Sequence, residues 1–132
     1  MAADSVDVVR RALGHFLETG EPDWALLDEQ IATCDHDLLD AGEYRGHDGH
    51  RRWLADWSVA WSDFEIARVV EVVDAGDDVV VVVFEVKATG RTSGASVERE
   101  DAMVCRVQDG RIARIDYYNN RAQALAQVGL DP

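Results

Sequence analysis

The apolar residues in the first part of the chain recur with the period of an α-helix. From Ser5 to Gly20 they return every three or four positions, which predicts an amphipathic helix. Ser5 is the expected N-cap, and Thr19-Gly20 is expected to end the helix. The residues of its apolar face are Val6, Val9, Leu13, Phe16 and Leu17.

Two further helices are expected before the period changes. The segment "EPDWALLDEQIA" (21–32) predicts a short helix with proline in its first turn, and residues 33–46 predict a loop or a short strand. Residues 47–63 predict a third helix, in which Trp53, Trp57 and Trp61 are four residues apart on one face. Because a tryptophan mainly contributes buried area, this stripe is expected to be helix core.

The second part of the chain has the period of β-strands. Residues 64–73, 97–107 and 112–119 alternate, whereas 79–90 are apolar enough for a central strand covered on both faces. Tight turns are predicted at "DAGDD" and "QDGR", and a last short helix at 121–129. Helices followed by antiparallel strands predict an α+β domain, with the helices on one face of a curved sheet.

Length and charge narrow the function classes. The 132 residues are expected to form a single domain, 1–132. The 26 acidic and 13 basic residues give a formal charge of −13, which argues against a nucleic-acid partner. No stretch approaches the roughly 20 apolar residues of a membrane helix, so no membrane partner is expected. Cys34 and Cys105 match no metal-binding spacing and indicate a reduced, cytoplasmic protein.

Several local motifs occur in a recognisable order. They are "YRGHDGHRRWL", "VVDAGDDVVVVV", "TSGASVE" and the final "MVCRVQDGRIARIDYYNNRAQALAQVGL". Together they resemble the SnoaL-like family of the nuclear-transport-factor-2-like superfamily over roughly residues 5 to 130. The resemblance implies a cone-shaped, curved antiparallel sheet wrapped around N-terminal helices, with a pocket at the open end. It also implies a homodimer formed through the outer face of the sheet.

The family includes polyketide cyclases, ketosteroid isomerases and epoxide hydrolases, so the fold alone does not select an activity. A ketosteroid isomerase needs a carboxylate base and an oxyanion hole made of a tyrosine and a protonated aspartic acid. The resemblance puts Leu13 and Met103 at the two donor positions, so both donors are missing. Loss of one such donor typically raises the barrier by about 2.7–4 kcal/mol, which argues against this activity.

An epoxide hydrolase of the limonene-epoxide type is an alternative. The positions of its Arg-x-Asp pair correspond to Val80 and Val82. However, Arg99 and Asp101 supply the same spacing one strand later, and Asp116 would complete the site. This hypothesis requires these three side chains to converge around one water molecule.

The favoured activity is a cofactor-independent cyclase or isomerase reaction on a small hydrophobic molecule. Such a reaction needs a base beside a carbonyl, a donor for the enolate oxygen and an apolar cup. Asp40, or else Asp37, is favoured as the base, with Tyr44 or Tyr118 as the donor. The other candidates for these two roles are His36, Asp116 and Arg99. The cup is expected to include Phe16, Trp24, Trp53, Trp57, Phe64, Met103 and Val107. A ligand-binding protein without catalysis is the competing class.

The orientation of the strands decides which charged side chains can reach the pocket. Alternation with Met103 predicts that Arg99 and Asp101 point inward, as pocket residues. Asp116 has two open orientations, because a bulge near a strand end reverses the alternation.

The stretch "DHDLLDAGEYRGHDGH" (35–50) contains three of the four histidines. Zinc would need about four converging ligands, and Gly49 interrupts the His47–His50 pair, so neither a metal nor a cofactor is expected. His47 and His50 are expected to be solvated residues at a helix start. The earlier half, "DHDLLD", is expected to be an acid/base loop, because a carboxyl group beside apolar walls acquires a raised pKa.

Overall fold

The structure is a computed structural model, and it describes residues 4–36, 43–90 and 92–130. Its helices are α1 (Ser5–Thr19), α2 (Gly46–Ala60) and α3 (Arg121–Gln127), with one 3-10 turn, η1 (Trp24–Leu26). Its strands are β1 (Leu27–Asp35), β2 (Glu43–Arg45), β3 (Trp61–Gly76), β4 (Val79–Gly90), β5 (Ser96–Gln108) and β6 (Arg111–Tyr118).

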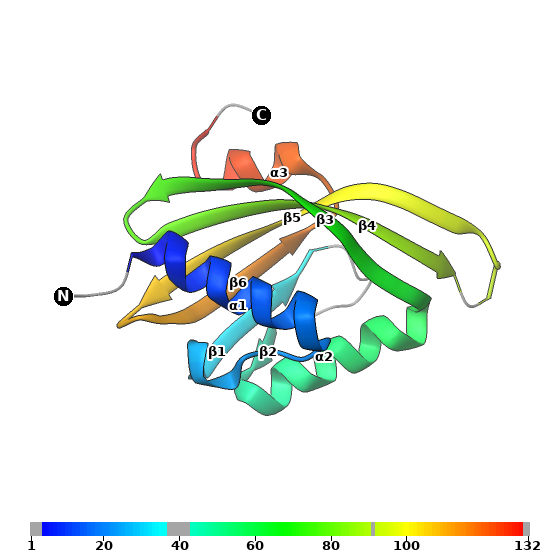
Figure 1. The fold of residues 1–132 in the computed structure, drawn as a ribbon, viewed down its shortest axis with the longest axis horizontal. Coiled ribbons are helices and arrows are strands. Elements are labelled where there is room, and N and C mark those ends of the chain that lie inside the picture. The colour runs from blue at the N-terminus through cyan, green and yellow to red at the C-terminus, as the bar shows by residue number, and fades with distance from the viewer. Residues whose placement is uncertain (1–3, 37–42, 91, 131–132) are drawn as a thin grey trace.

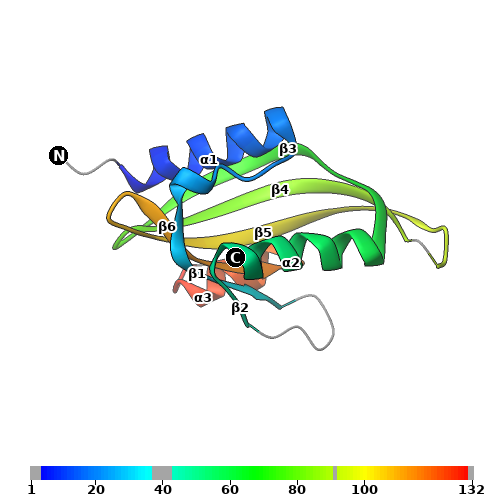
Figure 2. The ribbon, with the colours of Figure 1, turned by 90° about the horizontal axis from the view of Figure 1, so that it is seen from below.

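The strands form one curved sheet in the order β2-β1-β6-β5-β4-β3. The sheet curls around α1 and α2 on its inner face, and α3 lies against its outer face (Figures 1 and 2). The expected α+β cone is therefore confirmed. One detail differs, because β1 runs parallel to β6 while the other neighbours are antiparallel, so the sheet is mixed.

Irregular pairing explains much of the curvature. The ladder between β3 and β4 shifts register four times along its length. Each such bulge bends the strand and increases its twist. The first shift, between Ser62 and Glu65, contains Asp63 with a positive φ of 53°. The long β3 therefore bends over the end of the cone rather than continuing as a flat edge.

The alternation of β4 and β5 separates two clusters of buried side chains. Val80, Val82 and Phe84 point to the inner face, where they pack with residues of α1 and α2. Val81 and Val83 point to the outer face and pack with Ala124 and Leu125 of α3. This is why the apolar run of β4 is continuous: helices cover both of its faces.

The prediction of a helix over 21–32 is wrong. Only the 3-10 turn η1 forms there, capped by the Asp23 side chain, and β1 follows from Leu27. Within β1, Ile31, Thr33 and Asp35 are buried and face the inner side of the sheet. Pairing of β1 with both β2 and β6 thus overrides the helical pattern of the local sequence.

Two helix boundaries also differ from expectation. The N-cap of α1 is Asp4, whose side chain accepts a hydrogen bond from the amide of Val6, whereas Ser5 is buried and donates to Asp78 at 2.7 Å. The third predicted helix, α2, ends at Ala60, and Trp61 already has extended backbone angles as the first residue of β3. The tryptophan stripe is therefore shared between α2 and β3.

Candidate functional site

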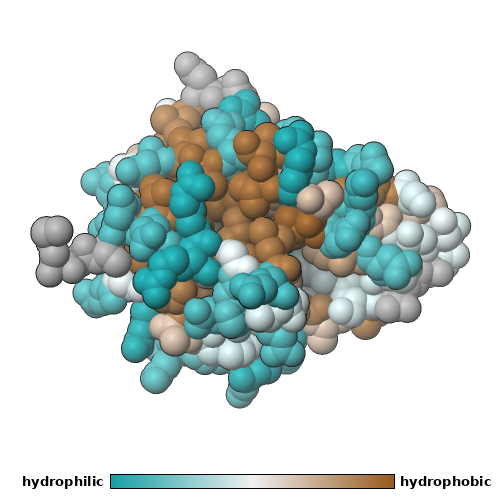
Figure 3. Space-filling model, in the orientation of Figure 1, coloured by the Kyte–Doolittle hydropathy of each residue, from teal (hydrophilic) through white to brown (hydrophobic). Residues whose placement is uncertain are grey.

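A cavity of about 450 Å³ lies between α1, α2 and the inner face of the sheet. This volume is within the range of small-molecule pockets. The helical side chains that line it are mostly apolar and include Val9, Leu13, Phe16, Trp53, Leu54 and Trp57. The strand residues that line it include Phe64, Ile66, Phe84, Met103, Ile115 and Tyr117. In Figure 3 hydrophobic side chains gather in the middle of the viewed face, with hydrophilic ones around them.

Two periodicities produce this lining. In α1 the cavity-facing residues are three or four positions apart, as one helix face requires. In β4 and β5 they are two positions apart, as in Val82 and Phe84 or Met103 and Cys105. The same periodicities that build the core therefore also form the cavity. It lies where the side chains of the helices and those of the strands do not reach one another.

The substrate-binding residues expected from the sequence divide into two groups. Those in the cavity lining are Phe16, Trp53, Trp57, Phe64 and Met103. Those outside it are Trp24, Arg99, Asp101 and Val107.

Two of the residues outside the lining still pack close to it. Trp24 packs on the ring of His47, with the centroids 4.9 Å apart. The guanidinium of Arg51 lies over the ring of Trp24. Val107 is partly buried against the same inner core.

A buried chain of polar groups runs behind one wall. Asp101 is fully buried, and it accepts a hydrogen bond from the hydroxyl of Tyr117, which lines the cavity. The Arg99 Nε donates to the other oxygen of Asp101 at 2.6 Å. Burial, followed by the negative charge of Asp101, raises the pKa of Tyr117, so this phenol keeps its proton. Arg99 and Asp101 thus face inward as expected.

Asp35 is a site residue that sequence reasoning missed. It is 4% exposed, and its Oδ2 accepts hydrogen bonds from the indole Nε1 of Trp53 at 2.6 Å and of Trp57 at 2.7 Å. Both indoles line the cavity, so this one carboxylate oxygen fixes the orientation of two wall residues. The available signal was the spacing of Ile31, Thr33 and Asp35 by two, together with the spacing of the tryptophans by four.

His50 is a second site residue that the sequence analysis did not predict. The expectation of a solvated histidine is wrong, because His50 is 5% exposed and lines the cavity. Its Nδ1 lies 3.0 Å from the hydroxyl oxygen of Thr33. Burial, and then the nearby His47, lowers the pKa of His50 to about 4, so its imidazole is neutral at neutral pH.

Two glycines explain why the start of α2 lies so deep. Gly46 has a positive φ of 70°, which a larger residue adopts only with strain. At Gly49 a Cβ would lie 2.9 Å from the backbone carbon of Tyr44, too close for any side chain. The helix therefore packs directly against β2, and His50 points into the core.

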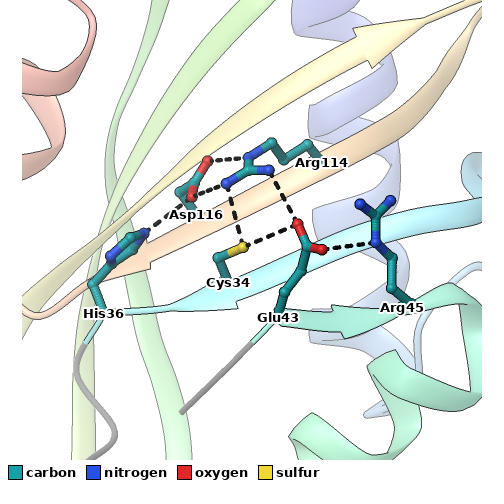
Figure 4. Close-up of polar contacts among 6 residues, drawn as sticks. All are labelled: Cys34, His36, Glu43, Arg45, Arg114 and Asp116. Carbon is teal, nitrogen blue, oxygen red and sulfur yellow. Dashed lines mark hydrogen bonds and ion pairs between the residues drawn. The ribbon is translucent and has the colours of Figure 1, made fainter. Parts of the chain in front are cut away.

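The other charged cluster lies on the outer face of the sheet (Figure 4). Asp116 accepts hydrogen bonds from the Nε and Nη2 of Arg114 at 2.9 and 3.1 Å. The Nε2 of His36 lies 3.0 Å from Asp116 Oδ1. The imidazole of His36 stacks on the ring of Tyr118 with centroids 4.4 Å apart. Burial would raise the pKa of Asp116, but the hydrogen bonds from Arg114 and His36 outweigh it and lower this pKa. Of the two orientations that the sequence left open for Asp116, the structure shows the outward one.

This arrangement separates the residues proposed for an epoxide hydrolase. Arg99 and Asp101 pair on the inner side, next to Tyr117. Asp116 points to the opposite face, where Arg114 and His36 contact it. The three side chains do not converge around one site.

The remaining catalytic candidates are not in the described cavity lining. Tyr44 donates its hydroxyl hydrogen to Asp56 Oδ2 at 2.6 Å, in an exposed contact. Tyr118 is buried in the outer cluster under α3. Asp37 and Asp40 lie outside the described residues. Within the part of the chain that the structure describes, no group of three or more His, Cys, Asp or Glu side chains is arranged to hold a metal ion.

Replacement of Asp116 by alanine is expected to lower the free energy of unfolding by about 1–3 kcal/mol, because Arg114 loses the acceptor of two hydrogen bonds. Urea denaturation measures this loss. Alanine at the exposed Glu65 is the control and should change stability by less than about 0.5 kcal/mol. Equal effects of the two substitutions would show that the outer cluster does not stabilise the sheet.

Comparisons with known proteins agree with this architecture. A model of the SnoaL-like polyketide cyclase family matches residues 7–128. Among curated proteins, none matches the sequence. No helix in the described part of the chain is long and apolar enough to cross a membrane.

Solved structures share the fold at low sequence identity. A nuclear-transport-factor-2-like protein from Burkholderia thailandensis E264 has a TM-score of 0.76 and 23% identity, over 96% of this chain and 98% of that chain. A protein of unknown function from Burkholderia pseudomallei K96243 has a TM-score of 0.74 and 18% identity, with the same coverage of 96% and 98%. TerC, crystallised with polyporic acid, has a TM-score of 0.72 and 14% identity, over 95% and 98%.

Proposed function

Because the chain belongs to the SnoaL-like polyketide cyclase family, we propose that it catalyses a cofactor-independent proton transfer of the cyclase or isomerase type. Its substrate would be a small, neutral, hydrophobic molecule. The observation that carries the proposal is the cavity of about 450 Å³ with a mostly apolar lining. A cavity of this size and lining excludes water from a bound ligand, which strengthens any acid/base contact made inside it.

The polar groups of the lining support a neutral ligand. His50 is neutral at neutral pH, and Tyr117 keeps its proton. The carboxylates among the described lining residues, Asp23 and Asp63, remain partly or largely exposed, and no Lys or Arg accompanies them. An anionic ligand would therefore lose its hydration without gaining a counter-ion, and a cationic one would meet carboxylates only at the exposed part of the lining.

Asp40, or else Asp37, is proposed as the base. Both follow closely after Asp35, the last residue of β1, whose carboxylate contacts the cavity tryptophans Trp53 and Trp57. A carboxylate is the type of base that proton removal beside a carbonyl requires, and burial raises its pKa toward the useful range.

Deuterium exchange tests this activity without knowledge of the natural substrate. The bicyclic ketone 2-tetralone has acidic hydrogens next to its carbonyl, and incubation in D2O with the protein should exchange them faster than buffer does. Asp40→Asn, or else Asp37→Asn, is expected to reduce the protein-dependent rate by about 100-fold or more, as loss of a general base does. Mass spectrometry of the recovered ketone measures the rate, and Glu29→Gln at an exposed position of β1 is the control.

The outcome also separates the two function classes. Binding of 2-tetralone with exchange no faster than in buffer would identify a ligand-binding protein without this catalysis. Unchanged exchange in both Asp40→Asn and Asp37→Asn would exclude these bases.

We also propose that the chain forms a homodimer, as the family resemblance implies, and that it is cytoplasmic, as its two free cysteines indicate. Light scattering during gel filtration should then give twice the mass of one chain. A mass equal to one chain over a wide range of concentrations would contradict the dimer.

A further inference from the structure

The two nitrogens of His50 have different surroundings, and Thr33 determines which one carries the proton. Thr33 is fully buried, and among the described residues the hydrogen-bond partner of its hydroxyl is the Nδ1 of His50, at 3.0 Å. A buried hydroxyl hydrogen needs an acceptor, and a neutral imidazole offers one nitrogen as acceptor and the other as donor. The Thr33 hydroxyl therefore donates to Nδ1, which puts the imidazole proton on Nε2.

The Nε2 of His50 is left for an occupant of the cavity. Among the described residues no side chain or backbone group forms a hydrogen bond with it. Because no fully buried side-chain nitrogen or oxygen of the described residues lacks a hydrogen-bond partner, Nε2 is accessible from the cavity. His50 lines the cavity, and Trp24 and Trp53 pack on its ring with centroids 5.8 and 5.1 Å away. These contacts hold the imidazole in one orientation within an apolar wall.

We propose that the Nε2–H of His50 is the oxygen-recognition group of the cavity, and that it donates a hydrogen bond to a carbonyl oxygen of the ligand. This inference rests on the proposed function and specifies its substrate class: a ketone or related carbonyl compound with an apolar skeleton. A neutral imidazole donor suits such an oxygen, and also the enolate that forms when a neighbouring proton leaves. A carboxylate ligand would fit less well, because the described lining holds no Lys or Arg.

A pair of probes with the same shape isolates this hydrogen bond. Tetralin is the hydrocarbon counterpart of 2-tetralone, and it lacks only the oxygen. The ratio of the two dissociation constants, ketone over hydrocarbon, is compared between wild type and the Thr33→Val/His50→Phe double variant. The double variant replaces both members of the buried pair by apolar groups, which avoids an orphaned partner. The ratio is expected to rise about fivefold to tenfold in the variant, because the ketone loses the affinity that one hydrogen bond contributes.

Nitrogen-15 NMR of the histidines gives a readout that does not depend on a ligand. The wild type should show His50 as the Nε2–H tautomer, and Thr33→Val should increase the share of the Nδ1–H tautomer, because the hydroxyl donor is gone. A wild-type His50 with its proton on Nδ1 would overturn the inference.

The binding results distinguish the two proposals. If tetralin and 2-tetralone both bind but their ratio is the same in wild type and double variant, only the role of His50 is overturned. If neither compound binds the wild type, the proposed function fails and the ligand assignment fails with it. A rise in the ratio, with tetralin binding retained, supports both.

Discussion

Replacement of Asp35 by alanine is expected to lower the free energy of unfolding by about 3–5 kcal/mol. The substitution leaves the indole N–H groups of Trp53 and Trp57 without the carboxylate oxygen that accepts both of them. Each donor left unsatisfied in the interior costs about 1–3 kcal/mol, and breaking a buried charged network has effects of similar total size. Urea denaturation, followed by circular dichroism, measures the loss.

Asparagine at position 35 provides the matched control. Asp35→Asn keeps a carbonyl oxygen of similar size that can accept from the indoles, so its loss should be clearly smaller than that of Asp35→Ala. Asp35→Ala should also weaken ligand binding, because Trp53 and Trp57 line the cavity. An alanine variant within about 1 kcal/mol of wild type would contradict the assigned role of this carboxylate.

Acidification from pH 6.5 to pH 4 is expected to destabilise the folded protein through His50 by about 3 kcal/mol. The pKa of His50 is lowered from 6.5 to about 4, first by burial and then by His47. As the pH falls through 6.5, the unfolded chain binds a proton at this position while the folded chain does not, so unfolding becomes more favourable. Well below pH 4 both states bind the proton, and this contribution no longer changes.

The Thr33→Val/His50→Phe variant separates this effect from those of other acidic groups. It has no ionisable group at position 50, so the fall in its unfolding free energy between pH 6.5 and 4 should be smaller than that of wild type by about 3 kcal/mol. Protonation of Asp116 changes the stability at a lower pH than that of His50, because the pKa of Asp116 is lowered from an ordinary value of 3.8. Parallel profiles for the two proteins would show that His50 does not have a depressed pKa.

Much of the fold could be predicted from the sequence because it depends on periodicity. The helical spacing from Ser5 to Gly20 and the alternation after residue 63 correspond to α1 and to the strands from β3 to β6. The family resemblance then supplied the cone, which the structure confirms. The segment 21–32 shows the limit of this reasoning: its apolar spacing fits a helix, yet pairing with β2 and β6 makes most of it a strand.

The polar groups of the site were harder to predict, because they depend on contacts between distant segments. Asp35 faces the tryptophans only because β1 extends to that residue, whereas the local pattern predicts a loop or a short strand over 33–46. His50 is buried because Gly46 and Gly49 allow close packing of α2 on β2, a contact that no local pattern shows. Asp116 could be assigned to the outer face only once Ile115 and Tyr117 were found in the inner core.

The central claim is that the cavity admits a small hydrophobic molecule, and isothermal titration with tetralin tests it most directly. The wild type is compared with Ala12→Trp, which puts a large side chain into the cavity lining, and with Ala55→Trp, which adds the same side chain at an exposed position of α2. Saturable binding of one tetralin per chain to wild type and Ala55→Trp, with none to Ala12→Trp, is the predicted result. Absence of binding to the wild type, or equal binding to all three proteins, would contradict the account.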